Sequence, residues 1–389
     1  MKNGIRVVIG LVLAMLLAGC KGFWDPPPST STTTTTPTTL SSGVFYVLNQ
    51  TSGQIVAYDI SSGTLNKIGA YAIAGPTAMA IAPNGNFLYV STLASGIFVY
   101  DIGSGGALTP GNSGGSVSGE LASAIQVDPS GLWLIDAYTI GAVGSYGLQV
   151  DAIPITASGT LDNSRTEQIP NNLPSFTNAS ANGMVISPDG KNVFVAAGEA
   201  GTVAIPFSSG SASPLAASST HTFGPLHALG ADLSVAVDPS STPRLFYIGE
   251  TNVNSTGALR VFDYSTLAEA SYSPIASGGL APSAILPIAS GQYVYVANGQ
   301  STNSKGNVAW FPVTASGTTY TVTVGSTIAS GVQPTSLAED SKGNFVLAVS
   351  TGGNPDLEAY TISSGALTSA ITSTTGTDPV GAVAVAALP

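Results

Sequence analysis

Short apolar stretches alternate with glycine-rich polar turns along this chain, and the pattern recurs roughly every 40–50 residues. One copy reads PTAMAIAPNGNFLYV from Pro76 to Val90 and continues as GIFVYDIGSGGAL from Gly96 to Leu108. An apolar strand leads into a Pro-x-Gly turn, a second strand ends near a Tyr-Val pair, and a third leads into a Ser-Gly turn. Because glycine adopts positive φ at low cost, these turns suit tight reversals between strands. Many short strands separated by such turns predict an all-β fold.

The copies are counted by aligning them on the turn that follows the first strand. The seven anchor positions are Pro83, Pro129, Pro188, Pro239, Ala289, Ser341 and Ala387. The last copy, from Asp378 to Pro389, holds only the first strand, whereas the first copy, from Val44, lacks that strand. The two halves complete one unit if the chain closes into a ring, which also protects strand edges. We therefore predict a seven-bladed β-propeller over residues 43–389, closed by pairing of the C-terminal strand with the N-terminal blade.

The N-terminus has the features of a targeting signal. Lys2 and Arg6 precede an apolar stretch over residues 7–17, which is too short to span a bilayer. The sequence LAGC, ending at Cys20, resembles the bacterial lipoprotein box, and the resemblance implies cleavage after residue 19 and a lipid on Cys20. Cys20 is the only cysteine, so it has no partner for an intrachain disulfide. The alternative is a plain secretory signal with an incidental cysteine.

Residues 20–42 are predicted to tether the propeller to a membrane. The stretch PPPSTSTTTTTPTTLSS, residues 26–42, has almost nothing to bury and is expected to stay disordered, reaching roughly 50–60 Å when extended. Lys21 stands where enterobacterial lipoproteins kept at the inner membrane carry aspartate, which favours the outer membrane. We expect a lipid-anchored cell-envelope protein with its propeller in the periplasm or at the cell surface.

Charge narrows the possible partners. Charged residues make up 8% of the chain, against roughly 25% in an average globular domain, and the net charge is −11. Nucleic-acid binding needs a basic footprint on phosphates, so we expect no nucleic-acid partner. A glycan, a peptide or a small lactone at the channel mouth fits this composition better.

The repeat resembles the YVTN-type propellers and, more closely, the seven-bladed lactonase family, which includes 6-phosphogluconolactonase and carboxy-muconate cyclase. The resemblance rests on pairs such as Tyr89-Val90 and Tyr295-Val296 and on the turns that follow, and it covers nearly the whole mature domain. It implies the fold and a lactone hydrolase activity. The third unit, from Ala122, lacks the histidines that family members often carry there, and few basic residues are available to bind a phosphorylated lactone.

A site is expected where the loops before the first strands meet those after the second strands, at one mouth of the channel. Glu250 is the candidate general base, with a solvated loop glutamate as the alternative. His227 is the candidate that orients substrate, against an ordinary surface histidine. The predicted ligand-binding residues are Asn49, Asn298, Asn252 and Glu120. His221 and His227 match no zinc spacing, and we expect no metal and no cofactor.

Two functions follow from these patterns, and a degenerate propeller kept for structural reasons is a third option. The first is a binding or scaffold module for an uncharged ligand or a protein partner. The second is a lactone hydrolase acting on an extracytoplasmic lactone, with Glu250 as base and His227 or Asn298 stabilising the reacting group.

Overall fold

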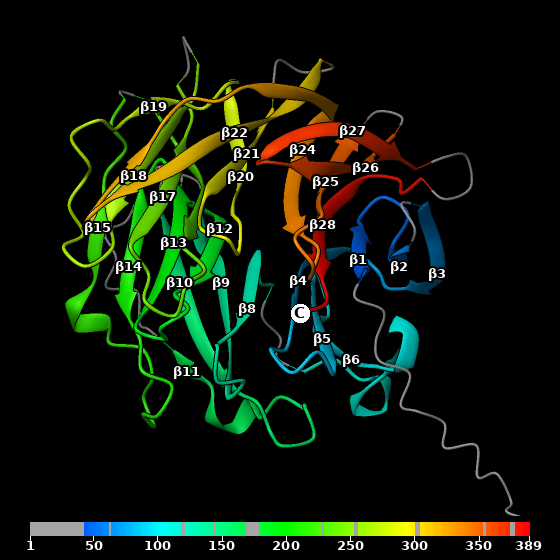
Figure 1. The fold of residues 1–389 in the computed structure, drawn as a ribbon. Helices are drawn as coiled ribbons and strands as arrows, with labels where there is room; N and C mark the ends of the chain where they lie inside the picture. Colours follow the sequence, from blue (N-terminus) through cyan, green and yellow to red (C-terminus); the bar gives the residue numbers. More distant parts are fainter. Residues whose placement is uncertain are drawn as a thin grey trace, which may run out of the picture. The chain divides into compact units, whose positions relative to one another are not determined.

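Strand pairing in the computed structural model gives five antiparallel sheets, three of four strands and two of eight strands (Figure 1). Each eight-stranded sheet consists of two neighbouring four-stranded blades joined by pairing between them, so the chain forms the seven blades of a propeller. The structure describes residues 43–61, 64–117, 121–142, 145–168, 179–227, 229–252, 256–299, 304–352, 355–373 and 378–389. These lie in one compact unit, Leu40–Pro389. The predicted signal, tether and lipidated Cys20, and also Glu120, lie outside the described residues. The prediction of an all-β propeller is confirmed.

Each blade contributes one strand to each of four concentric positions. The innermost strands, in order of blades 1 to 7, are β28 (Ala382–Ala387), β4 (Pro76–Ile81), β8 (Ala124–Val127), β12 (Ala179–Ile186), β16 (Asp232–Val237), β20 (Ala281–Pro287) and β24 (Thr327–Glu339). The second strands are β1 (Val44–Asn49), β5 (Phe87–Thr92), β9 (Trp133–Ala142), β13 (Asn192–Gly198), β17 (Leu245–Glu250), β21 (Tyr293–Gly299) and β25 (Phe345–Gly352). The third strands are β2 (Gln54–Ser61), β6 (Gly96–Ile102), β10 (Ser145–Pro154), β14 (Thr202–Pro206), β18 (Ala258–Asp263), β22 (Lys305–Ser316) and β26 (Leu357–Ser363). The outermost strands are β3 (Thr64–Ala72), β7 (Leu108–Pro110), β11 (Glu167–Gln168), β15 (His221–Phe223), β19 (Ile275–Ala276), β23 (Thr319–Val322) and β27 (Ala366–Thr372).

Short 3-10 turns occupy some of the connections. They are η1 (Ser104–Gly106), η2 (Asn112–Gly114), η3 (Asn163–Arg165) and η4 (Ala217–Ser219). Among the described residues, the structure contains no helix with the length and hydropathy needed to cross a bilayer.

The C-terminal strand closes the ring as predicted. β28 pairs antiparallel with β1, from Phe45 opposite Ala387 to Asn49 opposite Ala382, and Figure 1 shows the two strands side by side. Each innermost strand contacts the innermost strand of the next blade, and β24 contacts β28 to complete the circle. Blade 1 is therefore built from both ends of the described chain.

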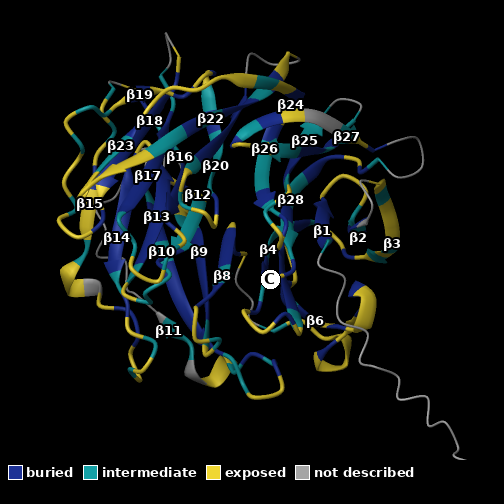
Figure 2. Cartoon of the chain, viewed as in Figure 1, coloured by how far each residue is buried: buried dark blue, intermediate teal, exposed yellow. Residues whose placement is uncertain are grey.

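The hydrophobic core lies between the blades. Seven clusters of buried apolar side chains each join two neighbouring blades, and the last joins blade 7 to blade 1. Second strands such as β13 and β17 are buried throughout, because both faces of each blade are covered, whereas β3 and β15 are largely exposed (Figure 2). The strands therefore read as nearly continuous apolar runs rather than as strict alternation.

The Tyr-Val pairs and the Ser-Gly turns recur because they are partners across blade interfaces. The hydroxyl of Tyr46 donates to the Gly106 carbonyl at 2.9 Å, and that of Tyr295 donates to the Gly365 carbonyl at 2.9 Å. Tyr89 makes the equivalent bond to blade 3. Gly106 and Gly365 have φ of 82° and 83°, which other residues rarely adopt. The turn glycine thus presents its carbonyl to a buried tyrosine that needs an acceptor.

The two faces of the propeller differ. The mouth face carries the loops before the innermost strands and after the second strands, such as those around residues 224–231 and 251–252. The turn face carries the Pro-x-Gly turns, whose glycines Gly85, Gly131 and Gly190 all have positive φ. β1 begins on the turn face, because Phe45 lies opposite the end of β28.

Side chains at the mouth face bind each blade to the next. In each pair, a side chain beside the start of one innermost strand donates to a backbone carbonyl of the following blade. These bonds join Gln50 to Pro76, Thr77 to Ala122, Asn182 to Asp232, Ser234 to Pro282, Ser283 to Pro334, and Thr335 to Ala382. Between blades 3 and 4 the bond lies toward the turn face, where the Gln126 side chain accepts from the N–H of Ile186, the last residue of β12. This chain of bonds, which we call the inter-blade ring, fixes the positions of the mouth loops.

Candidate functional site

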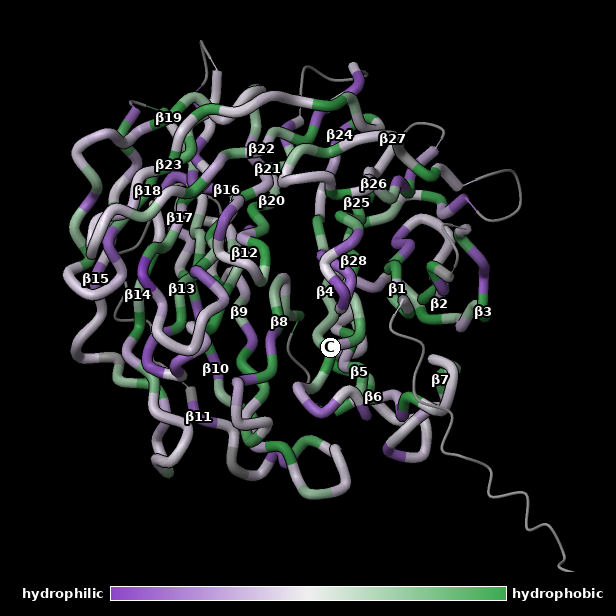
Figure 3. The backbone as a smooth tube through the Cα atoms, viewed as in Figure 1, coloured by the Kyte–Doolittle hydropathy of each residue, from purple (hydrophilic) through white to green (hydrophobic). Residues whose placement is uncertain are grey.

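Two cavities lie along the axial channel. Near the mouth face, a cavity of about 290 Å³ is lined by polar side chains, among them Ser123, Asn182 and Ser283, together with apolar ones such as Met79 and Met184. Deeper in, a cavity of about 630 Å³ is lined mainly by apolar side chains, which again include Met79 and Met184. Figure 3 shows hydrophobic stretches on β8 and β20, two of the lining strands. Many polar groups at the mouth already serve the inter-blade ring, so the channel wall offers few unused hydrogen bonds to a polar ligand.

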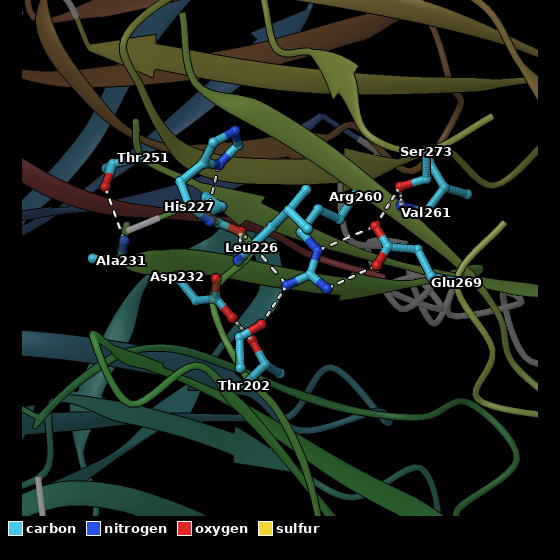
Figure 4. A network of polar contacts seen from close by, with 12 residues as sticks. Thr202, Leu226, His227, Ala231, Asp232, Thr251, Arg260, Val261, Glu269 and Ser273 are labelled. Atoms are coloured by element: carbon cyan, nitrogen blue, oxygen red, sulfur yellow. Dashed lines mark hydrogen bonds and ion pairs between the residues drawn. The ribbon is translucent and has the colours of Figure 1, made fainter. Parts of the chain in front are cut away.

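The structure brings Glu250 and His227 together. Glu250 Oε1 accepts from the His227 backbone N–H at 2.8 Å and lies 2.9 Å from the His227 ring Nδ1. Glu250 Oε2 accepts from the Leu226 backbone N–H at 2.9 Å. These contacts belong to the polar network drawn in Figure 4. The Glu250 side chain has no exposed surface, so it is not the solvated loop residue that was the alternative hypothesis.

Arg260 extends the network below the loop. Its Nη1 donates to the Gly224 carbonyl at 2.8 Å and lies 3.5 Å from Glu250 Oε2. Its Nη2 and Nε contact the Glu269 carboxylate at 2.8 and 3.2 Å (Figure 4). Burial opposes the charge of Arg260, but the bonds and the charge of Glu269 outweigh it and raise the pKa of Arg260. Burial likewise opposes the charge of Glu269, and hydrogen bonds from Arg260 and Ser273 lower its pKa.

Asp232, which was not predicted from the sequence as a site residue, also belongs to this network. It lies opposite Glu250 in the pairing of β16 with β17, and it is fully buried. Its Oδ2 accepts from the Thr202 hydroxyl at 2.7 Å, and its Oδ1 has no hydrogen-bond partner among the described groups. Burial raises the pKa of Asp232 to about 7, the Thr202 bond lowers it, and the charge of Glu250 raises it further.

The network binds the described parts of the loop before β16, residues 224–227 and 229–231. Glu250 binds two consecutive backbone N–H groups of this loop, and Arg260 binds the Gly224 carbonyl. The Ala231 N–H donates to the Thr251 hydroxyl oxygen at 3.0 Å. Because both Glu250 oxygens are occupied by the loop, its position in the structure suits an anchor for backbone better than an open base. Catalytic roles for Glu250 and His227 stay predictions.

The predicted ligand-binding asparagines lie in separate surroundings. Asn298 is buried, and its Nδ2 donates to the Ser277 carbonyl at 2.8 Å and lies 3.2 Å from Asn307 Oδ1. Asn49 is buried at the end of β1, whereas Asn252 is only partly exposed in the loop after β17. No group of three or more His, Cys, Asp or Glu side chains in the described part of the chain is arranged to hold a metal.

Exposed apolar side chains recur in the loops of the mouth face, a feature that was not predicted, and we call this set of residues the apolar collar. Nine large apolar side chains are exposed among the described residues, and six of them lie in mouth-face loops. These six, between 41% and 76% exposed, are Leu93, Leu121, Leu226, Leu229, Leu280 and Val380. Leu93 lies against the start of blade 2, where its N–H donates to the Gly75 carbonyl at 2.8 Å. The sequence feature that could have predicted this set is an apolar residue that recurs shortly before an innermost strand, as at Leu121 and Leu280.

Comparison with solved structures identifies the fold as that of a β-propeller. A protein from Bacteroides fragilis proposed to be a 6-phosphogluconolactonase aligns over 90% of this chain and 99% of its own, with a TM-score of 0.67 and 16% identity. A protein from Bacteroides uniformis with the same proposed activity aligns over 88% and 98%, with a TM-score of 0.67 and 16% identity. A protein from Lactobacillus plantarum aligns over 88% and 98%, with a TM-score of 0.63 and 19% identity.

These similarities describe the fold and not the activity. Altogether 1148 solved chains match, and they include a hydrazine synthase and a mitotic checkpoint complex, so the propeller alone does not select a function. No family model matches the sequence, and comparison with curated proteins gives no significant match.

Proposed function

We propose that this chain is a lipid-anchored cell-envelope propeller that binds a protein partner on its mouth face. The observation that carries the proposal is the apolar collar. Monomeric proteins rarely gather exposed apolar side chains in one region, and such patches mark interaction sites. The collar is also set on loops that the inter-blade ring and the Glu250 network hold in place. A preorganised surface loses little conformational entropy when it binds.

The anchor belongs to the same proposal. Cys20 carries the lipid, and residues 26–42 form the tether to the outer membrane. Because β1 begins on the turn face, Gly43, the first described residue, lies on the side opposite the collar. An anchor attached on that side leaves the mouth face accessible to a partner.

A lactone hydrolase is the second candidate, and the contact between Glu250 and His227 favours it. An imidazole 2.9 Å from a buried carboxylate is an arrangement that can hold a ring in one tautomer. In that case His227, whose side chain is 31% exposed, would be the group that meets substrate, and Glu250 would orient it. The chain offers no basic residue in this network besides the paired Arg260, so an uncharged lactone is the fitting substrate.

The binding proposal is tested with two leucines of equal exposure on opposite faces. Leu226 is 50% exposed in the collar, and Leu132 is 51% exposed on the turn face. Full-length protein is purified from envelope extracts with its partners, which are identified by mass spectrometry. A partner that Leu226→Ser loses and Leu132→Ser retains supports the proposal. Equal retention by both variants, with both folded by circular dichroism, contradicts it.

The enzyme proposal is tested with a panel of uncharged lactones. Hydrolysis by the wild type that falls strongly in His227→Ala supports a catalytic mouth face. Hydrolysis that is unchanged in both His227→Ala and Glu250→Gln removes these two residues from any catalytic role. Absence of turnover across the panel leaves the binding module as the function.

A further inference from the structure

Two acidic side chains meet where blade 7 joins the closing strand at the mouth face. Asp378 Oδ1 accepts from the Asp356 backbone N–H at 2.9 Å and from the Ser373 hydroxyl. Asp356 Oδ2 accepts from the Gly381 backbone N–H at 3.2 Å, just before β28. The two carboxylates are therefore held beside one another by the backbone that closes the ring.

Two buried oxygens at this junction have no hydrogen-bond partner among the described groups. One is Oδ1 of Asp356, a residue that is 5% exposed, and the other is Oδ1 of Asn49, which is 2% exposed. On β1, Phe45 and Val47 pack against blade 7 in the cluster that joins it to blade 1. Alternation along β1 places Asn49 on the same side as Phe45 and Val47, and its backbone pairs with Ala382, next to Gly381, at an irregular point of the ladder. Because the Gly381 N–H donates to Asp356, Asn49 lies at the same end of this blade interface as the acidic pair.

No described cation neutralises this pair. None of the ion pairs among the described residues involves Asp356 or Asp378. Burial raises the pKa of Asp356 to about 6, and the neighbouring Asp378 raises it further. An unpaired buried charge beside a like charge is costly, and so is a buried oxygen without a donor. Both costs disappear if a cation lies between these oxygens.

We propose that Asp356, Asp378 and Asn49 bind a calcium ion that locks the closure of the propeller. Carboxylate and amide oxygens are the ligands of hard divalent cations. Calcium fits better than magnesium, because it accepts irregular geometry and sheds water more readily. With two carboxylates, we expect an affinity in the range of extracellular modules, about 10⁻⁴–10⁻³ M. The proposal goes beyond the function proposed above and departs from the expectation that the chain binds no metal.

Terbium luminescence tests the site directly, since terbium occupies calcium sites and is sensitised by nearby aromatic rings. Burial raises the pKa of Tyr58, and the nearby charge of Asp378 raises it further, which places this ring near the proposed site. The full-length protein should sensitise terbium emission, calcium should displace the ion, and Asp356→Asn should abolish the signal. Asp101→Asn, the same change at an exposed aspartate on β6, is the matched control and should keep it. Emission that is equal in the wild type and in Asp356→Asn overturns the proposal.

Thermal unfolding gives an independent readout that separates a cation site from misfolding of the variant. At 10 mM calcium the wild type should gain about 2 °C in Tm over its value in EDTA. Asp356→Asn should show no calcium shift and should be at least as stable as the wild type in EDTA, because it lacks the unpaired charge. The proposal is contradicted if calcium does not raise the Tm of the wild type, or if it raises the Tm of the wild type and of Asp356→Asn equally. Neither result depends on whether the collar binds a partner.

Discussion

Replacing Glu250 by glutamine should destabilise the propeller far more than replacing an exposed surface glutamate by glutamine. The carboxylate oxygens face N–H donors on both sides: Leu226 and Arg260 at one oxygen, and the backbone and ring of His227 at the other. Glutamine must turn an amide NH₂ toward one of these groups. Whichever orientation it takes, a donor then faces a donor in a buried site.

The size of the effect follows from those contacts. A hydrogen bond to a charged group contributes about 1.5–3 kcal/mol, and a buried donor left without an acceptor costs about 1–3 kcal/mol. Removing the charge also relieves its repulsion of Asp232, whose pKa Glu250 helps to raise, and this returns part of the loss. We therefore expect Glu250→Gln to lower the free energy of unfolding by about 3 kcal/mol.

The assay is urea denaturation of the full-length protein, combined with hydrogen exchange of the loop amides. Glu199→Gln is the matched control, because Glu199 is exposed and surface changes rarely exceed about 0.5 kcal/mol. Glu250→Gln should lose protection at the amides of Leu226 and His227, which the carboxylate now binds. The reasoning fails if Glu250→Gln is as stable as Glu199→Gln and both loop amides remain protected.

Four further outcomes follow from the structure. The pKa of Asp232 is about 7 in the folded protein, so this carboxyl keeps its proton to higher pH than it does in the unfolded chain. The free energy of unfolding should therefore fall by at most about 4 kcal/mol as the pH rises from about 4 to about 7. Urea titrations at several pH values should show this fall for the wild type and a flatter profile for Asp232→Asn. Deleting residues 382–389 removes the innermost strand of blade 1 and should abolish the cooperative thermal transition seen by circular dichroism. Tyr295→Phe removes a buried bond to Gly365 and should cost about 1 kcal/mol in urea denaturation. Cys20→Ser should move the protein from the membrane fraction to the soluble fraction and prevent labelling with a fatty acid, whereas labelling that persists would exclude lipidation at this residue.

The architecture was predictable because its signals are local and repeated. The Tyr-Val pairs and Ser-Gly turns recur because each tyrosine needs an acceptor across a blade interface, and the turn glycine supplies it. The ring closure could be predicted from two partial copies at the ends of the sequence, and β28 pairs with β1 as expected. These features depend on the order of the strands along the chain, which can be read from the repeated sequence pattern.

The site was predictable only in part, because burial depends on the neighbouring blade. Glu250 and His227 were each identified as candidates, but their contact and the burial of Glu250 require the loop to fold back over β17. Asp232 was missed, since its raised pKa comes from enclosure between blades 4 and 5 and its partner Thr202 belongs to the other blade. The collar was missed because its residues are far apart in the sequence and share the mouth face only in the folded ring.

Photo-cross-linking in intact cells tests the central claim most directly. A photoreactive residue is placed at Leu226 in the collar or at Leu132 on the turn face, two positions of equal exposure. The mouth face is the docking surface if residue 226 yields a discrete cross-linked protein and residue 132 does not. Cross-links of equal yield and identity at both positions, or none at residue 226 in a folded and membrane-localised protein, would contradict it.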